Sequence, residues 1–404
     1  EEVVVEIRAS ALPQLLSAVD AGELFERRRL GSGPVVLTAV AEARALLEER
    51  IALFVKTAKS PGAKALLKKQ GVFFREKAPV ATRACFLFSG QGSQYGGMMR
   101  AVAELVPAAK EVLDRADQWA TAHDLEPISR VMFAPSIPND VFWVQATLLV
   151  ADVMAAAAAE SVGVVPDVVT GHSFGDYAAL VVAEAWTLET ALKATLIRSR
   201  AIEATAEPGG MISVAATRAE VETVLSTLPP IGVVAPSNLN APKQTVVSGA
   251  PEALEAASIA LADRGFEVRK LNVPRAFHSP LMAGARSTLS EGLAKLELKA
   301  PRVPYLSSVT GAIETEPGDI RALLVEQLTR PVDFVAQIER LVAGNVGLFI
   351  ECGPRGVLSG LTEQILADRG GEADVLSIDD AQRPGRFALA RLAALVQSRR
   401  PSDA

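Results

Sequence analysis

The chain has 404 residues, of which 49% are hydrophobic and 22% charged, and its net charge at pH 7 is −6. This composition is that of a soluble globular protein, and the length suggests about two or three domains. Nucleic-acid-binding domains are basic, so the acidic balance argues against a nucleic-acid partner.

Residues 1–81 are expected to form a small α/β unit of their own. Strand-like and helical patterns alternate along it, at 3–10, 11–24, 34–40 and 41–58. The stretch VFFREKAPV at 72–80 carries Lys and Pro residues, so we interpret it as a tether to the next unit.

Strands and helices alternate from Arg83 onward in a way that favours a parallel sheet with helices on both faces. We assign 82–208 and 275–396 to this α/β core. The longest apolar stretch, 141–159, is interrupted by Gln145 and Asp152, so it predicts a buried helix and no membrane association. The other expected elements of the core include strands at 83–90, 165–170, 305–309, 347–352 and 374–379, and helices at 176–186 and 188–204.

The segment 209–274 has a different order of expected elements, namely strand, helix, two strands, helix and strand. This βαββαβ order is typical of ferredoxin-like domains, and it predicts an inserted subdomain. The last residues, 397–404, are expected to be a polar tail. The chain begins with Glu1 and not Met, which suggests processing or a segment of something larger.

The sequence GHSFG at 171–175 fits the nucleophile elbow G-x-S-x-G. It lies between an apolar strand and an amphipathic helix that we expect to start at about Phe174. Ser173 could simply cap that helix, but a cap does not explain both glycines. The nucleophile interpretation does, because a tight strand-to-helix turn leaves no room for side chains at those positions.

A serine hydroxyl needs a base, and the chain has three histidines. His123 lies in a polar helical stretch, and His172 is next to Ser173, where its side chain should point away from the hydroxyl. His278 follows the inserted subdomain, where a strand meets a loop. By elimination His278 is the best candidate for the base.

The tetrahedral oxyanion of an acyl transfer also needs donors. The elbow supplies the N–H of Phe174, and Gln91, at the tip of the Gly-rich turn FSGQGSQYGG, is a candidate for a second donor. Arg198 either pairs with the end of its own helix or binds a substrate carboxylate in a bidentate manner.

Together these residues resemble the malonyl-CoA:acyl-carrier-protein transacylases and the acyltransferase domains of polyketide synthases. The motifs occur in the family's order from 83 to about 395. They are GQGSQ (90–94), GHSFG (171–175), Arg198, NLN (238–240), AFH (276–278), RPVDF (330–334) and FIECGP (349–354). The resemblance implies an α/β-hydrolase-like domain with a ferredoxin-like insertion.

The resemblance implies a ping-pong acyltransferase in which Ser173 is acylated and His278 is its base. It implies that a backbone carbonyl orients His278, at a position that we match to Asp333. Gln91 and the amide of Phe174 become the oxyanion donors. Arg198 becomes the anchor of the substrate carboxylate with Gln145 and Asn240 as neighbours, and His172 shapes the turn and the pocket mouth.

The implied substrate is malonyl-CoA, and the implied partner is an acyl-carrier protein whose phosphopantetheine thiol accepts the acyl group. No metal and no bound cofactor are expected. Phe277, directly before His278, is typical of the malonyl type, although a methylmalonyl preference stays open. Two departures from the family pattern are Arg275 in RAFH, where HAFH is commoner, and Asp176, where Glu is usual; we expect Asp176 to matter little.

Residues 1–81 look like the linker that joins a ketosynthase to its acyltransferase. The stretch KKQGVFFREKAP at 68–79 is similar to iterative synthases of the enediyne and polyunsaturated-fatty-acid type. Two alternatives stay open, a serine hydrolase such as an editing thioesterase on the same elbow, and an inactive docking module. Cys85 and Cys352 lie in apolar surroundings without metal-ligand spacing, so we expect reduced thiols in a cytoplasmic protein.

Overall fold

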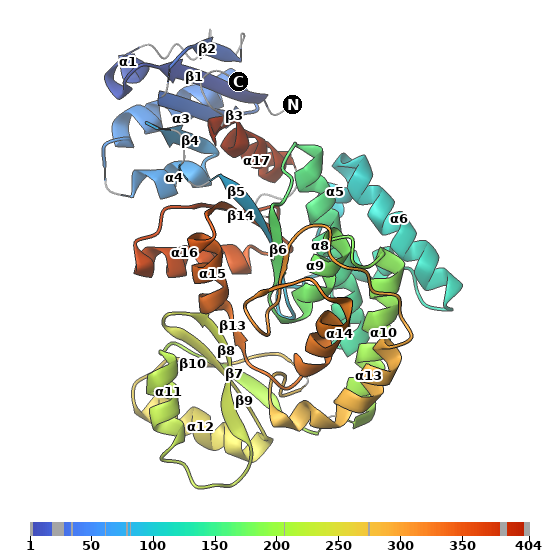
Figure 1. The fold of residues 1–404 in the computed structure, drawn as a ribbon. Coiled ribbons are helices and arrows are strands. Elements are labelled where there is room, and N and C mark those ends of the chain that lie inside the picture. Colours follow the sequence, from blue (N-terminus) through green and yellow to red (C-terminus); the bar gives the residue numbers. More distant parts are fainter. Residues whose placement is uncertain are drawn as a thin grey trace.

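A computed structural model of the chain describes residues 3–17, 28–33, 35–60, 62–77, 80, 82–205, 207–273, 275–379 and 386–399. In this part of the chain the strands form three sheets, which lie one above another in Figure 1. The N-terminal sheet is at the top of that view, a mainly parallel sheet is in the middle, and a mainly antiparallel sheet is at the bottom.

The N-terminal sheet has the strand order β2-β1-β3-β4. The last of these strands is a departure from the sequence interpretation. Val72 and Phe73, which we assigned to a tether, are buried in β4 and pair with β3, because two adjacent apolar residues complete the edge of this sheet. The elements are β1 (Val3–Ala9), α1 (Leu12–Ser17), β2 (Arg29–Gly31), β3 (Val35–Ala41), α3 (Arg44–Thr57), α4 (Ala63–Lys69) and β4 (Val72–Arg75). The helix expected at 11–24 begins as α1, and its part at 18–24 lies outside the described residues.

The C-terminal helix α17 (Arg386–Arg399) packs on this N-terminal sheet, as Figure 1 shows. The Thr38 hydroxyl donates to the carbonyl of Ala394 at 2.7 Å, and Arg399 pairs with Asp374 of the central sheet. The helix runs to Arg399, so the polar tail that the sequence predicts from 397 starts no earlier than residue 400. The N-terminal sheet and the C-terminal helix α17 are therefore packed together.

The central sheet has the order β12-β11-β6-β5-β14-β15 and is parallel except for the edge strand β12. The predicted parallel sheet is thus confirmed. Its strands are β5 (Arg83–Phe88), β6 (Val168–Gly171), β11 (Tyr305–Leu306), β12 (Ile313–Glu314), β14 (Val346–Cys352) and β15 (Asp374–Ser377). The helices of this unit are α5 (Arg100–Leu105), α6 (Pro107–Ala122), α7 (Ile128–Met132), α8 (Val141–Ser161), α9 (Asp176–Val182), α10 (Leu188–Thr205), α13 (Arg286–Leu293), α14 (Pro317–Glu326), α15 (Phe334–Ala343) and α16 (Val357–Arg369).

The third sheet confirms the ferredoxin-like insertion. Four of its strands have the order β10-β7-β9-β8 and are all antiparallel, and they come from a βαββαβ segment. A fifth strand, β13 (Val332–Asp333), joins in parallel to β8 from the later part of the core. The segment consists of β7 (Gly210–Val214), α11 (Arg218–Leu225), β8 (Val234–Ala241), β9 (Gln244–Gly249), α12 (Pro251–Asp263) and β10 (Val268–Lys270).

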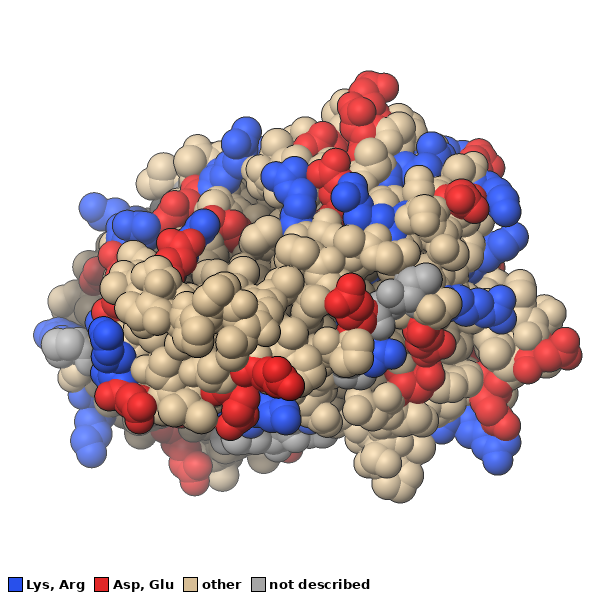
Figure 2. All heavy atoms as spheres, turned by 90° about the horizontal axis from the view of Figure 1, so that it is seen from below, with Lys and Arg blue, Asp and Glu red and all other residues tan. Residues whose placement is uncertain are grey.

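Acidic and basic side chains are interspersed on the face of the molecule that Figure 2 shows, which is the lower face of Figure 1. Positive and negative charges therefore both contribute to this surface, although the chain as a whole carries a net charge of −6.

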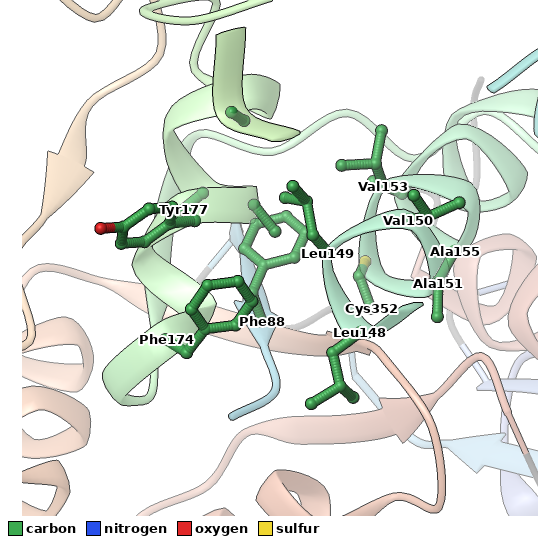
Figure 3. Close-up of a cluster of buried hydrophobic side chains, with 14 of the residues drawn as sticks. Phe88, Leu148, Leu149, Val150, Ala151, Val153, Ala155, Phe174, Tyr177 and Cys352 are labelled. Atoms are coloured by element: carbon green, nitrogen blue, oxygen red, sulfur yellow. The ribbon is translucent and has the colours of Figure 1, made fainter. Parts of the chain in front are cut away.

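The helix predicted from the apolar stretch is α8, which lies against the central sheet. Among the described residues it is the one helix that is long and apolar enough to cross a membrane, but 89% of its most apolar window is buried within the protein. Figure 3 shows its residue Leu149 beside Phe88 of β5, and both belong, with Leu148, Phe174 and Tyr177, to one buried cluster. The core therefore extends directly beneath the elbow.

Candidate active site

Ser173 lies at a sharp turn between β6 and α9 and has a φ of 55°, a left-handed conformation that is uncommon for residues other than glycine. A side chain at Gly171 would place its Cβ 2.0 Å from the amide nitrogen of Asp176, and one at Gly175 would lie 2.1 Å from the carbonyl oxygen of Phe88. Both glycines are therefore required by close packing. Residues 173–175 form a 3-10 turn, so the α-helix itself starts at Asp176.

The Ser173 hydroxyl lies 2.7 Å from Nε2 of His278, a residue that is 105 positions away in the sequence. The other ring nitrogen, Nδ1, lies 2.8 Å from the carbonyl oxygen of Gln327 and 3.1 Å from that of Arg330. Because carbonyls only accept hydrogen bonds, Nδ1 carries the proton and Nε2 is free to take one from Ser173. Burial, with smaller contributions from His172 and Arg198, lowers the pKa of His278 to about 3, so the ring is neutral.

Asp333 does not orient His278, so the position that we matched for the orienting carbonyl is wrong. Asp333 instead caps α15, where its carboxylate accepts from the backbone N–H of Ala336 at 2.9 Å. The carbonyls that face His278 come earlier, from the turn after α14. A contact made by the main chain carries no side-chain signature, which is why the sequence misplaces it.

The other two histidines have different partners. His172 Nε2 lies 2.7 Å from the side-chain oxygen of Asn240 in β8, and the ring meets Phe334 edge-on. His123 stacks on Trp119 at the end of α6 and contacts its carbonyl oxygen. His172 thus links the elbow to the inserted sheet.

Gln91 and Gln145 are brought together. The buried Gln145 side chain donates from Nε2 to Oε1 of Gln91 at 3.1 Å, which fixes the tip of the Gly-rich turn. Phe174 directly follows Ser173, at the start of a helical turn, where backbone N–H groups lack partners within the helix. A narrow crevice borders Gln91, and it is lined by Gln91, Gln94, Asn139, Asp140, Val141, Val144, Asn272 and Val273.

Arg198 is 0% exposed, and none of its guanidinium nitrogens has a hydrogen-bond partner among the described residues. Its Cζ lies 5.5 to 5.9 Å from the ring centres of Phe174, Tyr177 and Phe277. Two of these rings are adjacent in sequence to Ser173 and His278, so the cation lies next to the Ser-His pair. Burial lowers the pKa of Arg198.

The structure argues against one of the two interpretations of Arg198. The helix α10 continues to Thr205, so Arg198 lies in its interior and does not pair with its C-terminus. Gln145 and Asn240, which we expected as its neighbours, have their side-chain contacts with Gln91 and His172.

Comparison with known proteins matches the acyl transferase domain family to residues 85–390. The chain belongs to this family. It is 34% identical to the malonyl CoA-acyl carrier protein transacylase of Bacillus subtilis over 70% of the chain and 90% of that protein. The acyltransferase domain from the second module of the salinomycin polyketide synthase matches with a TM-score of 0.77 and 29% identity, over 95% of this chain and 86% of that one.

A malonyl-transacylase solved in complex with its type II polyketide synthase acyl-carrier protein, the pair PlMCAT and AntF, also has this fold. It matches with a TM-score of 0.70 and 26% identity, over 78% of this chain and all of that one. This acyltransferase covers only a small part of the polyketide synthases that it matches, 14% of Pks15/1 from Mycobacterium marinum and 6% of GfsB from Streptomyces halstedii.

Sequence reasoning missed one residue of this acyltransferase site, Gln327. Its side-chain amide donates to the main-chain carbonyl of Ser173 and to the carboxylate of Asp176, both at 2.8 Å. Its main-chain carbonyl faces His278. Nothing in the local sequence VEQLTRP marks it, because its importance depends on contacts with residues about 150 positions earlier.

Proposed function

We propose that this protein transfers a malonyl group from coenzyme A to the phosphopantetheine thiol of an acyl-carrier protein, through an acyl-serine at Ser173. The observation that carries the proposal is the buried guanidinium of Arg198 beside a Ser-His pair, without a hydrogen-bond partner in the part of the chain that the structure describes. A carboxylate on the substrate would supply the two oxygens that a guanidinium binds in a bidentate manner.

In the first half-reaction, the Ser173 oxygen attacks the thioester carbon and its proton passes to Nε2 of His278. The carbonyl oxygen becomes an oxyanion, for which we propose the N–H of Phe174 and the Gln91 side chain as donors. When the intermediate collapses, the carbon–sulfur bond breaks and His278 returns the proton to the CoA thiolate.

In the second half-reaction, the thiol of the carrier attacks the malonyl-serine, and the same proton transfers run in reverse. Arg198 also connects substrate binding to the base. Its charge is one cause of the low pKa of His278, so a bound malonyl carboxylate would offset that charge and make His278 a better proton acceptor.

The N-terminal sheet supports a polyketide synthase setting. The acyl transferase match starts at residue 85, after that sheet, whereas GfsB of Streptomyces halstedii aligns with 92% of the chain. We therefore propose that residues 1–81 are a linker to a neighbouring ketosynthase, that 82–208 and 275–396 form the acyltransferase core, and that 209–274 is its insertion. The buried free thiols of Cys85 and Cys352 support a reducing, cytoplasmic location.

The test is to mix the protein with malonyl-CoA and measure its intact mass after rapid acid quench. We expect an adduct of about 86 Da, one malonyl group, on Ser173, and its transfer to a holo-acyl-carrier protein or to free pantetheine as a surrogate thiol. The variant Ser173→Ala should form no adduct.

Release of CoA without an adduct, with malonate accumulating, would instead identify a serine hydrolase. A competition among malonyl-, methylmalonyl- and acetyl-CoA tests the carboxylate anchor. Equal use of acetyl and malonyl groups would contradict the role proposed for Arg198.

A further inference from the structure

Asp176, in the first turn of α9, is a buried carboxylate with an unusually complete set of donors. It is 1% exposed. One oxygen accepts from the N–H of Gly171, and the other accepts from the N–H and the hydroxyl of Ser308 and from the side-chain amide of Gln327. These four donors and the side chain of Tyr305, which also hydrogen-bonds to Asp176, indicate that the ionised form is the one that fits.

Two of those contacts lead to the reacting atoms. Gly171 ends β6, two residues before Ser173, so Asp176 holds the strand side of the elbow. Gln327 reaches both members of the Ser-His pair, because its side chain donates to the carbonyl of Ser173 while its own carbonyl lies 2.8 Å from Nδ1 of His278. The side chain of Gln327 is in turn held by Asp176 at 2.8 Å.

We propose that Asp176 is a positioning residue for acyl transfer, which acts through Gln327 to fix the distance between the Ser173 hydroxyl and Nε2 of His278. It touches neither substrate nor the reacting atoms. This inference rests on the proposed acyl-serine chemistry, and it gives a function to a residue that the sequence alone led us to regard as unimportant.

The charge of Asp176 should then matter for the rate. Burial raises its pKa to about 7, although Ser308, Tyr305 and Gly171 lower it by hydrogen bonding. When the carboxyl is protonated, one of its oxygens becomes a donor, and the group can no longer accept from all of these N–H and O–H groups. The titratable and charged groups that face this region are Tyr305 on β11, Tyr177 on α9 and, from α10, Arg198.

His278 does not titrate in the same range, because its pKa is lowered to about 3. A loss of activity as the pH falls through about 7 would therefore report the protonation of Asp176 if Asp176→Asn abolishes it and a second buried carboxylate with a similar pKa does not affect it. A matched control exists in Glu351, a buried carboxylate whose pKa is also raised to about 7. It accepts from the backbone N–H groups of Leu358 and Ser359 at the start of α16.

The experiment measures single-turnover acylation of Ser173 by malonyl-CoA from pH 5.5 to pH 8.5. Asp176→Asn should acylate about 10²-fold more slowly than wild type at pH 8, the size of effect that a misplacement of about 1 Å produces. At pH 5.5 the two rates should agree within about 3-fold, because wild type is then mostly protonated. At pH 8, Asp176→Glu should acylate about 10-fold faster than Asp176→Asn, because it keeps the carboxylate.

Glu351→Gln should lower the melting temperature but keep the wild-type pH profile. If Asp176→Asn does not fold, Gln327→Leu replaces it, since it removes the side-chain amide and keeps the main-chain carbonyl. Gln327→Leu should acylate more slowly than wild type at pH 8, and its rate should no longer fall as the pH drops below 7. Normal acylation at pH 8, or an unchanged pH profile, in the folded variant overturns the proposal. Absence of acylation in wild type would contradict the proposed function itself.

Discussion

Two regions of this acyltransferase bury arginine side chains in opposite ways. In the N-terminal sheet, Arg8 is 5% exposed and donates to Glu6 at 2.7 Å, and Glu6 also pairs with Arg29. Beside the elbow, the guanidinium of Arg198 has no partner among the described residues. A charge paired within the fold serves the scaffold, whereas a buried charge without a partner reduces stability and indicates a ligand that completes it.

The sharpest test of this comparison is Arg198→Met, which keeps much of the volume and removes the charge. Transfer of malonyl groups should fall by about 10²-fold or more, because the carboxylate loses its anchor. At the same time the free energy of unfolding should rise by about 1 kcal/mol, since an unpaired buried charge is removed.

Steady-state kinetics and urea denaturation measure the two effects of Arg198→Met. Arg200→Met is the control, because Arg200 is an exposed arginine on the same helix. A variant that is both active and less stable would show that Arg198 is part of the scaffold.

The same exchange in the other region should have the opposite result. Arg8→Met leaves Arg29, whose side chain is largely exposed, as the partner of the buried Glu6. The free energy of unfolding should therefore fall by about 3 kcal/mol. The rate per folded molecule should stay unchanged, because this sheet does not contribute to the Ser-His pair. An unchanged urea midpoint would contradict the comparison.

Phe277 tests the walls around the unpaired cation. Its ring centre lies 5.9 Å from Cζ of Arg198 and it directly precedes His278. Phe277→Ala should shift the ratio of methylmalonyl to malonyl transfer by about 10-fold in favour of methylmalonyl, since space for one methyl group is gained. An unchanged ratio in the CoA competition assay would place the specificity elsewhere in the pocket.

The smallest effect is expected for Asp333→Ala. It removes the cap of α15, so stability should fall by about 1 kcal/mol while the transfer rate stays within about 2-fold of wild type. Thr217→Ala is the matched control, because Thr217 caps α11 by accepting from the N–H of Glu220 at 3.3 Å. A ten-fold loss of rate in Asp333→Ala alone would return Asp333 to the catalytic site.

The sequence by itself determined the parallel sheet, the ferredoxin-like insertion and the identity of the central residues. Alternating apolar patterns are local, so they predicted strands such as β5 and the βαββαβ order without any tertiary information. The elbow is a local motif as well, and with three histidines in the chain, elimination was enough to find His278.

Only the tertiary structure decided how these residues work together. The carbonyls of Gln327 and Arg330 that orient His278 belong to the main chain, which is the same in every residue, so no sequence pattern marks them. That Arg198 has no hydrogen-bond partner among the residues described depends on everything packed around it, and the network of Asp176 and Gln327 joins segments about 150 positions apart. Such contacts depend on how the chain packs in three dimensions, which local periodicity does not encode.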